Sequence, residues 1–155
     1  MKVSSFFTDG QQDQLLASIS EAEKETSGEI RVHIEKTCEE DVLDRAAWIF
    51  KKLGMEKTDE KNGVLFYLAV EDRKFAVIGD SGINSKVPKG FWDCIKAVLS
   101  NNFRDGKFTE GLSEGILLTG RQLKVHFPYH KDDVNELTNE ISFDKMEGRR
   151  SNGKE

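Results

Sequence analysis

Several residue types and motifs that build common active sites are scarce or missing in this 155-residue chain. Its two cysteines, Cys38 and Cys94, lie far apart in sequence, and no CxxC or Cys/His cluster is present. Such a pair is typical of two reduced, partly buried thiols, which argues against a structural zinc site. The sequence also contains no HExxH, P-loop or Rossmann fingerprint, so these signals of metalloprotease or nucleotide-binding activity are absent.

No stretch of apolar residues is long enough to cross a bilayer, and the opening MKVSSFFTDG has no apolar core of the kind that signal peptides have. The formal net charge is −5. Phosphate binding needs a basic face, so this balance argues against nucleic acid and anionic membrane surfaces, and it is compatible with cations. We therefore expect a soluble, cytoplasmic protein without direct membrane insertion, although a chain trimmed of a leader would have the same composition.

Clusters of apolar residues, which make up 37% of the chain, predict one mixed α/β domain. Strands are expected over 29–36, 63–70 and 74–78. Helices are expected from Thr8 to Gly28, over 41–53, from Pro88 to Asp105, and over the segment that ends at Pro128. The first two strands and the helix between them form a βαβ unit, which predicts parallel pairing and helices on both faces of the sheet. The last two strands form an antiparallel hairpin.

The first predicted strand alternates strictly between apolar and polar residues. Its two sets of side chains are Ile30, Val32 and Ile34 on one face, and Arg31, His33 and Glu35 on the other. This pattern predicts a strand with one wet or lightly covered face. We therefore interpret His33 as a solvated or partly covered histidine rather than as a catalytic base.

The composition changes near the end of the chain, where charged residues dominate. We expect residues 129–143 to pack over the surface of the domain formed by residues 1–128. The expected anchors of this extension are Leu137, Ile141 and Phe143. Residues 144–155 are predicted to be a disordered tail, because they have too little apolar area to offset the entropy cost of ordering.

The predicted hairpin brings two polar loops side by side. With a turn centred on Asp72, Val64 would lie opposite Asp80. Two residues further out, Asn62 would lie opposite Gly82. The first strand runs parallel to the second, so its start lies at the same end of the sheet. The three loops expected to converge are TSGE, DEKNG and GDSGIN, at residues 26–29, 59–63 and 79–84.

These loops are rich in hard oxygen donors, the ligands that Ca²⁺ and Mg²⁺ take in proteins. The candidate metal-site residues are Asp80, Asn62, Glu29, Ser81, Asn84 and Asp59, with Glu60 beside them and Asp105 as a further residue that could reach this edge. Among them, Asp80 is predicted to be a ligand or an immediate neighbour of the cation. The spacing matches no EF-hand loop. The alternative, that Asp, Asn, Ser and Gly stand here only as turn residues, stays open at this point.

Three stretches of the sequence resemble successive motifs of the TPM domain family, which is named after a thylakoid-lumen phosphatase, a photosystem II repair protein and a nematode receptor modulator. They are TSGEIRVHI, KNGVLFYLAVEDRKFAVIGDSGIN and FRDGKFTEGLSEGI. The resemblance covers roughly residues 5–128, and the run from Lys61 to Asn84 is its most specific part. The later FPYHKDDVNEL stretch is similar to the end of short soluble bacterial members.

The resemblance implies a three-layer α/β/α sandwich with a small mixed sheet. It also implies divalent-cation binding, as in some members, and the weak acid phosphatase activity of the plant branch. Asn62 and Gly63 match the usual Asn-Gly before the central strand, and Gly82 matches the second glycine of the commoner GYGLE loop. Asp80 and Asn84 depart from that loop. Asp80 stands where Gly usually stands and Asn84 where Glu usually stands, so one carboxylate is gained, one is lost, and their number stays similar.

Two classes of function follow from these expectations. The first is a module that binds Ca²⁺ or Mg²⁺ and acts through an unidentified protein partner, in a role such as membrane-protein maintenance. The alternative is a metal-assisted phosphatase of low activity, in which metal ions polarise the phosphoryl group. The three loops contain no arginine to clamp a phosphate, and the nearest candidate is Arg104. The sequence therefore favours binding over catalysis, and it indicates no catalytic residue.

Overall fold

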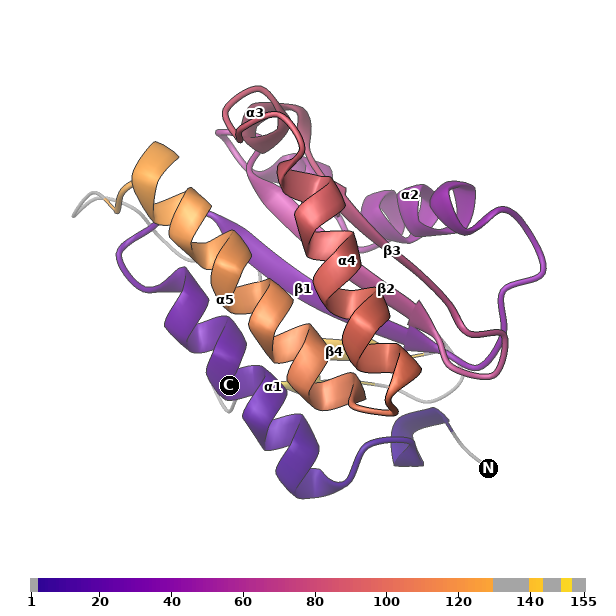
Figure 1. The fold of residues 1–155 in the computed structure, drawn as a ribbon. Helices are drawn as coiled ribbons and strands as arrows, with labels where there is room; N and C mark the ends of the chain where they lie inside the picture. Colours follow the sequence, from indigo (N-terminus) through magenta and orange to yellow (C-terminus); the bar gives the residue numbers. More distant parts are fainter. Residues whose placement is uncertain (1–2, 130–139, 144–148, 152–155) are drawn as a thin grey trace.

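A five-stranded mixed sheet runs through the molecule, with the strand order β3-β2-β1-β4-β5 (Figure 1). The computed structural model describes residues 3–129, 140–143 and 149–151. The strands are β1 (Glu29–Glu35), β2 (Gly63–Ala69), β3 (Lys74–Gly79), β4 (Glu140–Phe143) and β5 (Arg149–Ser151). β1 lies parallel to both β2 and β4, whereas β3 is antiparallel to β2, and β5 to β4. The predicted parallel unit and antiparallel hairpin are both confirmed.

Helices cover both faces of this sheet, which confirms the three-layer α/β/α arrangement (Figure 1). The helices are α1 (Asp9–Glu23), α2 (Val42–Lys52), α3 (Ser81–Asn84), α4 (Phe91–Arg104) and α5 (Phe108–His126), with 3₁₀ turns η1 (Val3–Ser5) and η2 (Met55–Lys57). α1, α4 and α5 pack on one face, and α2 packs on the other. None of the helices in the described part of the chain combines the length and apolarity that crossing a membrane requires.

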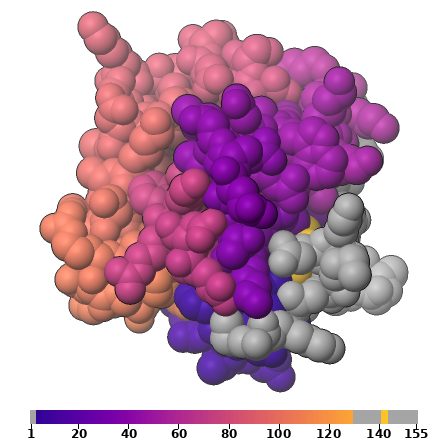
Figure 2. Space-filling model, turned by 90° about the vertical axis from the view of Figure 1, so that its right-hand side faces the viewer, coloured from indigo at the N-terminus to yellow at the C-terminus, as the bar shows by residue number. Residues whose placement is uncertain are grey.

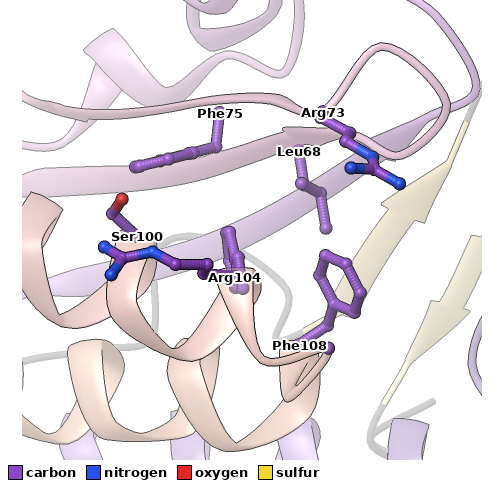
Figure 3. Close-up of a pocket in the computed structure, with 8 residues that line it drawn as sticks. Leu68, Arg73, Phe75, Ser100, Arg104 and Phe108 are labelled. Atoms are coloured by element: carbon purple, nitrogen blue, oxygen red, sulfur yellow. The ribbon is translucent and has the colours of Figure 1, made fainter.

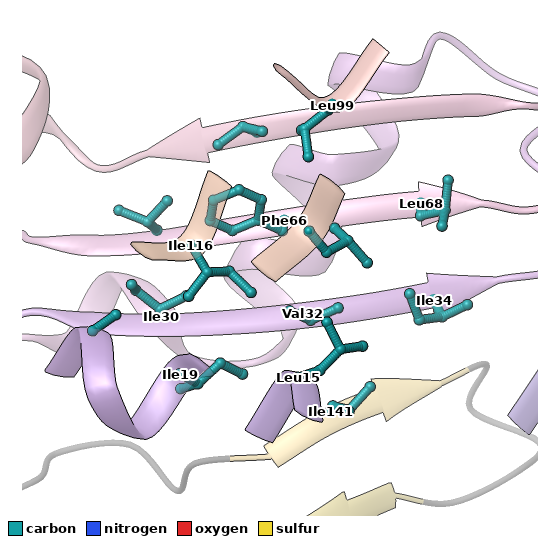
Figure 4. Packing of buried hydrophobic residues seen from close by; sticks show 14 of the residues in the cluster. Leu15, Ile19, Ile30, Val32, Ile34, Phe66, Leu68, Leu99, Ile116 and Ile141 are labelled. Atoms are coloured by element: carbon teal, nitrogen blue, oxygen red, sulfur yellow. The ribbon is translucent and has the colours of Figure 1, made fainter. Parts of the chain in front are cut away.

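The main core lies between the sheet and the three-helix layer (Figure 4). Ile30 and Val32 of β1 and Phe66 of β2 are fully buried there, against Leu15 of α1 and Ile116 of α5. Each side chain of this size contributes about 1.5–3 kcal/mol when it leaves water. The apolar half of the alternation in β1 therefore anchors the sheet to all three helices.

The first helix begins as the sequence predicts and ends earlier. Thr8 Oγ1 accepts a hydrogen bond from Gln11 N at 3.1 Å, and Gln11 Oε1 accepts one from Thr8 N at 2.9 Å, which forms a capping box. The helix ends at Glu23, five residues before the predicted Gly28. Gly28 instead lets β1 approach α5, since a Cβ there would lie 2.6 Å from Leu123 Cδ2.

Three local expectations differ from the structure. Pro88 was expected in the first turn of its helix, but α4 begins at Phe91, after Gly90 with φ of 82°. The segment 79–85, expected to be a loop, contains the single-turn helix α3. Leu43, which fits the apolar stripe of α2 by spacing, is 50% exposed. A φ of 82° lies outside the right-handed helical region, so α4 cannot extend back through Gly90 to Pro88.

The polar face of β1 is not wet. All seven residues of β1 are buried, and Arg31, His33 and Glu35 are no more than 4% exposed. Neighbours on the same face cover it, because Ser142 of β4 lies against His33 and Arg45 of α2 lies against Glu35. Its polar side chains are then covered and find partners within the protein, so the prediction of a solvated or partly covered His33 was wrong.

Residues 140–143 of the C-terminal extension form a strand of the sheet. β4 pairs with β1, and Ile141 and Phe143 are buried in the main core. The predicted anchor Leu137 lies outside the described residues. Of the predicted disordered tail, residues 149–151 form β5, and the remainder also lies outside the described residues. The boundaries at 128 and 143 stay predictions.

Candidate functional site

The β2–β3 hairpin differs from the prediction by one residue. Val64 pairs with Gly79 rather than with Asp80. Four residues connect the last paired positions of the two strands, whereas a turn centred on Asp72 requires an odd number, so every pair shifts by one. Asp80 still lies at the predicted edge, because its backbone N–H donates to the carbonyl of Gly63 at 2.9 Å.

The three polar loops lie against one another at this edge, as the parallel pairing predicts. The N–H of Glu29 donates to the carbonyl of Asn62 across 3.4 Å, which joins the first loop to the second. The third loop packs on the second so closely that a Cβ on Gly82 would lie 2.0 Å from the carbonyl oxygen of Glu60. Only glycine fits at that position. The edge is therefore a single cluster, which we call the loop cluster (residues 26–29, 59–63 and 79–84).

Two oxygen atoms in the loop cluster are buried without a hydrogen-bond partner among the described residues. Asn62 is 1% exposed, and its Nδ2 donates to Ser27 Oγ at 3.1 Å, but its Oδ1 has no partner there. Asp80 caps α3, and its Oδ1 accepts from Ser81 N at 2.7 Å, whereas its Oδ2 likewise has none. Buried polar atoms are nearly always paired, so two such oxygens in one cluster call for a ligand or water.

Ser27 and Glu60 complete this polar group, and sequence reasoning gave Ser27 no role. The Ser27 hydroxyl donates to Glu60 Oε2, and Asn62 Nδ2 lies 3.5 Å from the same oxygen. These bonds connect the start of β1 with the loop before β2. The position of Ser27, two residues before β1 in the TSGE stretch, was the only signal that could have indicated it.

The other predicted oxygen donors of the loop cluster differ in how far their side chains are already engaged in hydrogen bonds. Asn84 is engaged in structure, because its Nδ2 donates to the carbonyl of Gly79 at 2.7 Å and its Oδ1 accepts from Trp92 Nε1 at 2.9 Å. The remaining predicted donors of the loop cluster are Glu29, buried at the start of β1, Ser81 in α3, and the exposed Asp59. Asn84 therefore holds the third loop in place, and its Oδ1 already accepts one hydrogen bond.

Asp105 is not brought to the loop cluster. It follows Arg104, the last residue of α4, and Arg104 lies near Arg73 in the turn of the β2–β3 hairpin. That turn is at the opposite end of the sheet. The 14 residues of α4 span about 20 Å, which separates the two ends.

Carboxylates alone do not form a metal centre here. Within residues 3–129, 140–143 and 149–151, no group of three or more His, Cys, Asp or Glu side chains is placed to hold a metal ion. A cation at the loop cluster would therefore depend on amide, hydroxyl and carbonyl oxygens together with Asp80. Such mixed oxygen sets suit Ca²⁺ or Mg²⁺ and do not suit zinc.

A serine, a histidine and a carboxylate follow one another on the opposite, polar face of the sheet. Ser142 Oγ lies 2.7 Å from His33 Nδ1, and His33 Nε2 lies 3.2 Å from Glu35 Oε2. A carboxylate can only accept, so Nε2 donates to it, and the Ser142 hydroxyl also donates to the carbonyl oxygen of Val32 at 3.4 Å. The order matches that of a nucleophile, a base and an orienting acid. However, Ser142 is 1% exposed, so no substrate can reach it in this structure.

The surroundings of Glu35 support a structural role for this group. Arg45 donates through Nε to Oε1 at 2.9 Å and through Nη2 to Oε2 at 2.5 Å, and the Tyr67 hydroxyl donates to Oε1 at 2.5 Å. Burial alone would raise the pKa of Glu35, but the hydrogen bonds from His33, Arg45 and Tyr67 outweigh it and lower that pKa to about 2. Burial and the bond to Glu35 raise the pKa of Tyr67. The carboxylate thus stays ionised and ties α2, β1, β2 and β4 together.

The family model of the TPM domain matches residues 2–122, well over half of the chain. The chain belongs to the TPM domain family. The resemblance inferred from the three motifs is thereby confirmed, and the loop cluster described above lies wholly inside the matched part of this TPM domain. A search of curated proteins found no match to it.

Solved structures show the same fold. The BA42 protein from the psychrophilic bacterium Bizionia argentinensis is 46% identical, with a TM-score of 0.84, and the match covers 92% of this chain and 98% of that chain. The N-terminal domain of the cg2496 protein from Corynebacterium glutamicum is 11% identical with a TM-score of 0.63, covering 79% and 77%. The N-terminal domain of a protein from P. gingivalis is 20% identical with a TM-score of 0.63, covering 82% and 84%. These last two similarities concern the fold alone.

One stretch of this TPM domain matches a hydrolase motif by letter only. Residues 111–115 read GLSEG, which fits the GxSxG pattern. That motif acts as a nucleophile elbow when its serine sits on a sharp turn between a strand and a helix. Here the stretch lies inside α5, and Ser113 accepts a hydrogen bond from Ser18 at 3.0 Å across the α1–α5 contact. Its glycines serve close helix packing, and Ser113 is a packing residue.

Proposed function

We propose that this TPM domain binds one divalent cation, Ca²⁺ or Mg²⁺, at the loop cluster and acts through a protein partner, in a role such as membrane-protein maintenance. The observation that supports this proposal is the pair of buried oxygens, Asn62 Oδ1 and Asp80 Oδ2, which have no hydrogen-bond partner among the described residues. A cation coordinated by both atoms would remove the cost of leaving them unpaired.

Asp80 is the residue expected to contribute most to binding. It supplies a full negative charge, whereas Asn62 and Ser81 supply neutral oxygens that add no repulsion. The exposed carboxylates of Glu60 and Asp59 belong to the same cluster and lower the energy of a nearby cation. With so few carboxylates in direct reach, we expect a dissociation constant of roughly 10⁻⁵ to 10⁻³ M.

The phosphatase alternative has weaker support. Arg104 was the candidate arginine for clamping a phosphate, and it lies beside the hairpin turn at the other end of the sheet. The Ser142–His33–Glu35 group is buried, and Ser113 lies inside a helix contact. Turnover of a generic aryl phosphate is therefore expected to be very slow, and cation binding stays the preferred function.

The decisive experiment compares the wild type with Asp80→Asn, each in millimolar Ca²⁺ or Mg²⁺ and in chelator. Asparagine caps helices about as well as aspartate, so the substitution removes the charge and leaves the cap of α3 intact. The wild type should melt at a higher temperature with the cation, and its backbone amide signals should shift in the loop cluster. Asp80→Asn should lose about tenfold or more in cation affinity, on the scale of one charged ligand.

Asp105→Asn is the matched control, because it removes one exposed carboxylate at the far end of the sheet. It should bind the cation like the wild type. If the wild type shows neither a melting shift nor amide changes in the loop cluster, the site does not exist. If Asp80→Asn responds as strongly as Asp105→Asn, the protein binds a cation elsewhere.

A further inference from the structure

A cavity lies at the end of the sheet opposite to the loop cluster. It has a volume of about 460 Å³ and is bounded by the β2–β3 hairpin and by the turn that joins α4 to α5 (Figure 3). Figure 2 views this end of the sheet, with the hairpin in magenta beside the α4–α5 segment in orange. We call it the hairpin cavity. Volumes of about 300–1,000 Å³ are typical of sites for small molecules.

The wall of the hairpin cavity is apolar and held in place by ring contacts. Leu68 comes from β2, Phe75 from β3, and Phe103 and Phe108 from the two helices (Figure 3). The rings of Phe75 and Phe103 meet edge to face at 5.3 Å, and those of Phe103 and Phe108 lie 5.1 Å apart. Rings fixed in this way offer a preformed surface for another flat apolar group.

The eight described residues that line the cavity include two arginines and no acidic residue. Arg73 and Arg104 are both exposed, and Figure 3 shows their guanidinium groups on different sides of the apolar wall. Arg104 uses one N–H on Asn101 Oδ1 at 2.9 Å, which leaves other donors available. This is a local excess of positive charge in a chain of net charge −5.

The acidic residues next to these arginines in sequence do not line the cavity. The carboxylate of Asp72 accepts from the N–H of Cys38 at 2.7 Å, which engages it with the loop after β1. Glu71 pairs with Lys36 at 3.9 Å. Asp105 directly follows Arg104 and is exposed, and it is not among the residues that line the cavity. Arg73 and Arg104 therefore have no lining carboxylate to neutralise them, and a ligand with the opposite charge would.

We propose that the hairpin cavity binds a small organic anion that combines a flat apolar body with one acidic group, either a carboxylate or a sulfonate-like or phosphate-like group. The body would pack on Leu68 and the phenylalanine rings, and the acidic group would lie at one of the two arginines on the rim. A mostly apolar lining with a few polar groups is the usual composition of small-molecule sites, and the guanidinium group of arginine suits carboxylates and phosphates. The size of the cavity favours a free small molecule over a membrane lipid. This site is independent of the cation proposed at the loop cluster.

The test uses two dyes with similar apolar bodies. Anilinonaphthalene sulfonate carries a negative charge, and phenylnaphthylamine lacks it; both fluoresce more strongly in apolar surroundings. The wild type, in chelator, should bind the charged dye more tightly than the neutral one. The double variant Arg73→Gln/Arg104→Gln should bind the charged dye roughly three- to tenfold more weakly, as expected for exposed ion pairs, and the neutral dye with less than a roughly twofold change.

Two further variants locate the dye. Lys89→Gln/Lys96→Gln removes the same charge from exposed positions near and on α4 that do not line the cavity, and it should bind both dyes like the wild type. Ser100→Trp places a large side chain in the cavity lining and should weaken the binding of both dyes. Dispersed amide spectra and unchanged melting establish that each variant is folded.

Several results would overturn the proposal. One is an equal loss of affinity for the charged dye in the lysine and the arginine variants, which would mean that nonspecific electrostatic attraction holds the dye. Another is unchanged binding in Ser100→Trp, which would place the dye elsewhere. Arginine-dependent sedimentation with anionic phosphatidylglycerol vesicles, with no binding of the soluble dye, would show that the cavity takes a lipid rather than a free molecule.

Discussion

The two faces of β1 differ in chemistry although both are buried. One face places Ile30, Val32 and Ile34 under the helix layer of α1, α4 and α5, in the apolar core. The other places Glu35 among Arg45, Tyr67 and His33, in a hydrogen-bonded network that spans four elements. Apolar contacts can be made in many arrangements, whereas a buried carboxylate is stable only when each of its partners is in place. The polar face therefore specifies which elements meet, and the apolar face supplies most of the stability.

The largest effect is expected on the apolar face, from Phe66→Ala. Phe66 is fully buried in β2 and contacts the stretch of α5 around Gly115. Its truncation leaves a cavity and should lower the free energy of unfolding by about 3–5 kcal/mol. Urea denaturation followed by circular dichroism measures this. Leu43→Ala, which truncates a half-exposed residue of α2, is the control and should change stability by less than about 0.5 kcal/mol. Similar losses in both variants would contradict the core described above.

The second effect concerns the polar face, through Glu35→Gln. Glutamine keeps the shape and loses the charge that Arg45 and Tyr67 are arranged to meet. The expected loss is about 2 kcal/mol, at the low end for a buried pair, because the side chain of Arg45 is 27% exposed and water compensates part of it. Glu40→Gln is the matched control: Glu40 lies 3.9 Å from Arg45 with its side chain 55% exposed, and should contribute less than about 0.5 kcal/mol.

The same variant has a pH signature with a defined sign. The pKa of Glu35 falls from about 4.5 to about 2 on folding, so its ionised form stabilises the fold above pH 4.5. That contribution disappears as the pH falls from about 4.5 towards about 2. The stability difference between the wild type and Glu35→Gln should therefore shrink across this window. A difference that stays constant from neutral pH to the bottom of the window would show that the charge of Glu35 does not stabilise the fold.

The smallest effect is expected from Ser142→Ala, which removes the hydrogen bond between β4 and the ring of His33. One buried nitrogen then loses its partner, at a cost of about 1 kcal/mol. Amide hydrogen exchange should accelerate for residues 140–143 more than for β2. Ser100→Ala, on the exposed surface of α4, is the control and should leave the exchange of β4 unchanged. Uniform acceleration across the sheet would mean that Ser142 stabilises the whole fold rather than the docking of β4.

Local patterns were sufficient for most of the fold. The capping box at Thr8, the alternation in β1 and the apolar run of β2 each predicted an element that the structure contains. The hairpin register was wrong by one residue because the length of a turn, and not the hydrophobic pattern, decides which residues pair. β4 was missed because a four-residue strand among charged residues has almost no local signal.

The candidate site was only partly accessible from the sequence. Parallel pairing of β1 and β2 was enough to bring Glu29 and Asn62 together. The separation of Asp105 from this edge depends on the direction in which α4 runs, and no sequence motif indicates that direction. The partners of individual oxygens, such as Trp92 on Asn84, depend on packing between elements that are distant in the fold.

The sequence by itself determined the family, through the motifs that it shares with TPM domains. It also determined the order of the first three strands and the end of the sheet at which polar loops gather, because these follow from periodicity and from the geometry of a βαβ unit. Only the tertiary structure decided that His33 and Glu35 are buried, that Asn62 and Asp80 each retain an oxygen without a hydrogen-bond partner among the described residues, and that Arg73 and Arg104 share a cavity. Those outcomes depend on contacts between residues far apart in the chain, and their energies arise only when burial removes water from the polar groups.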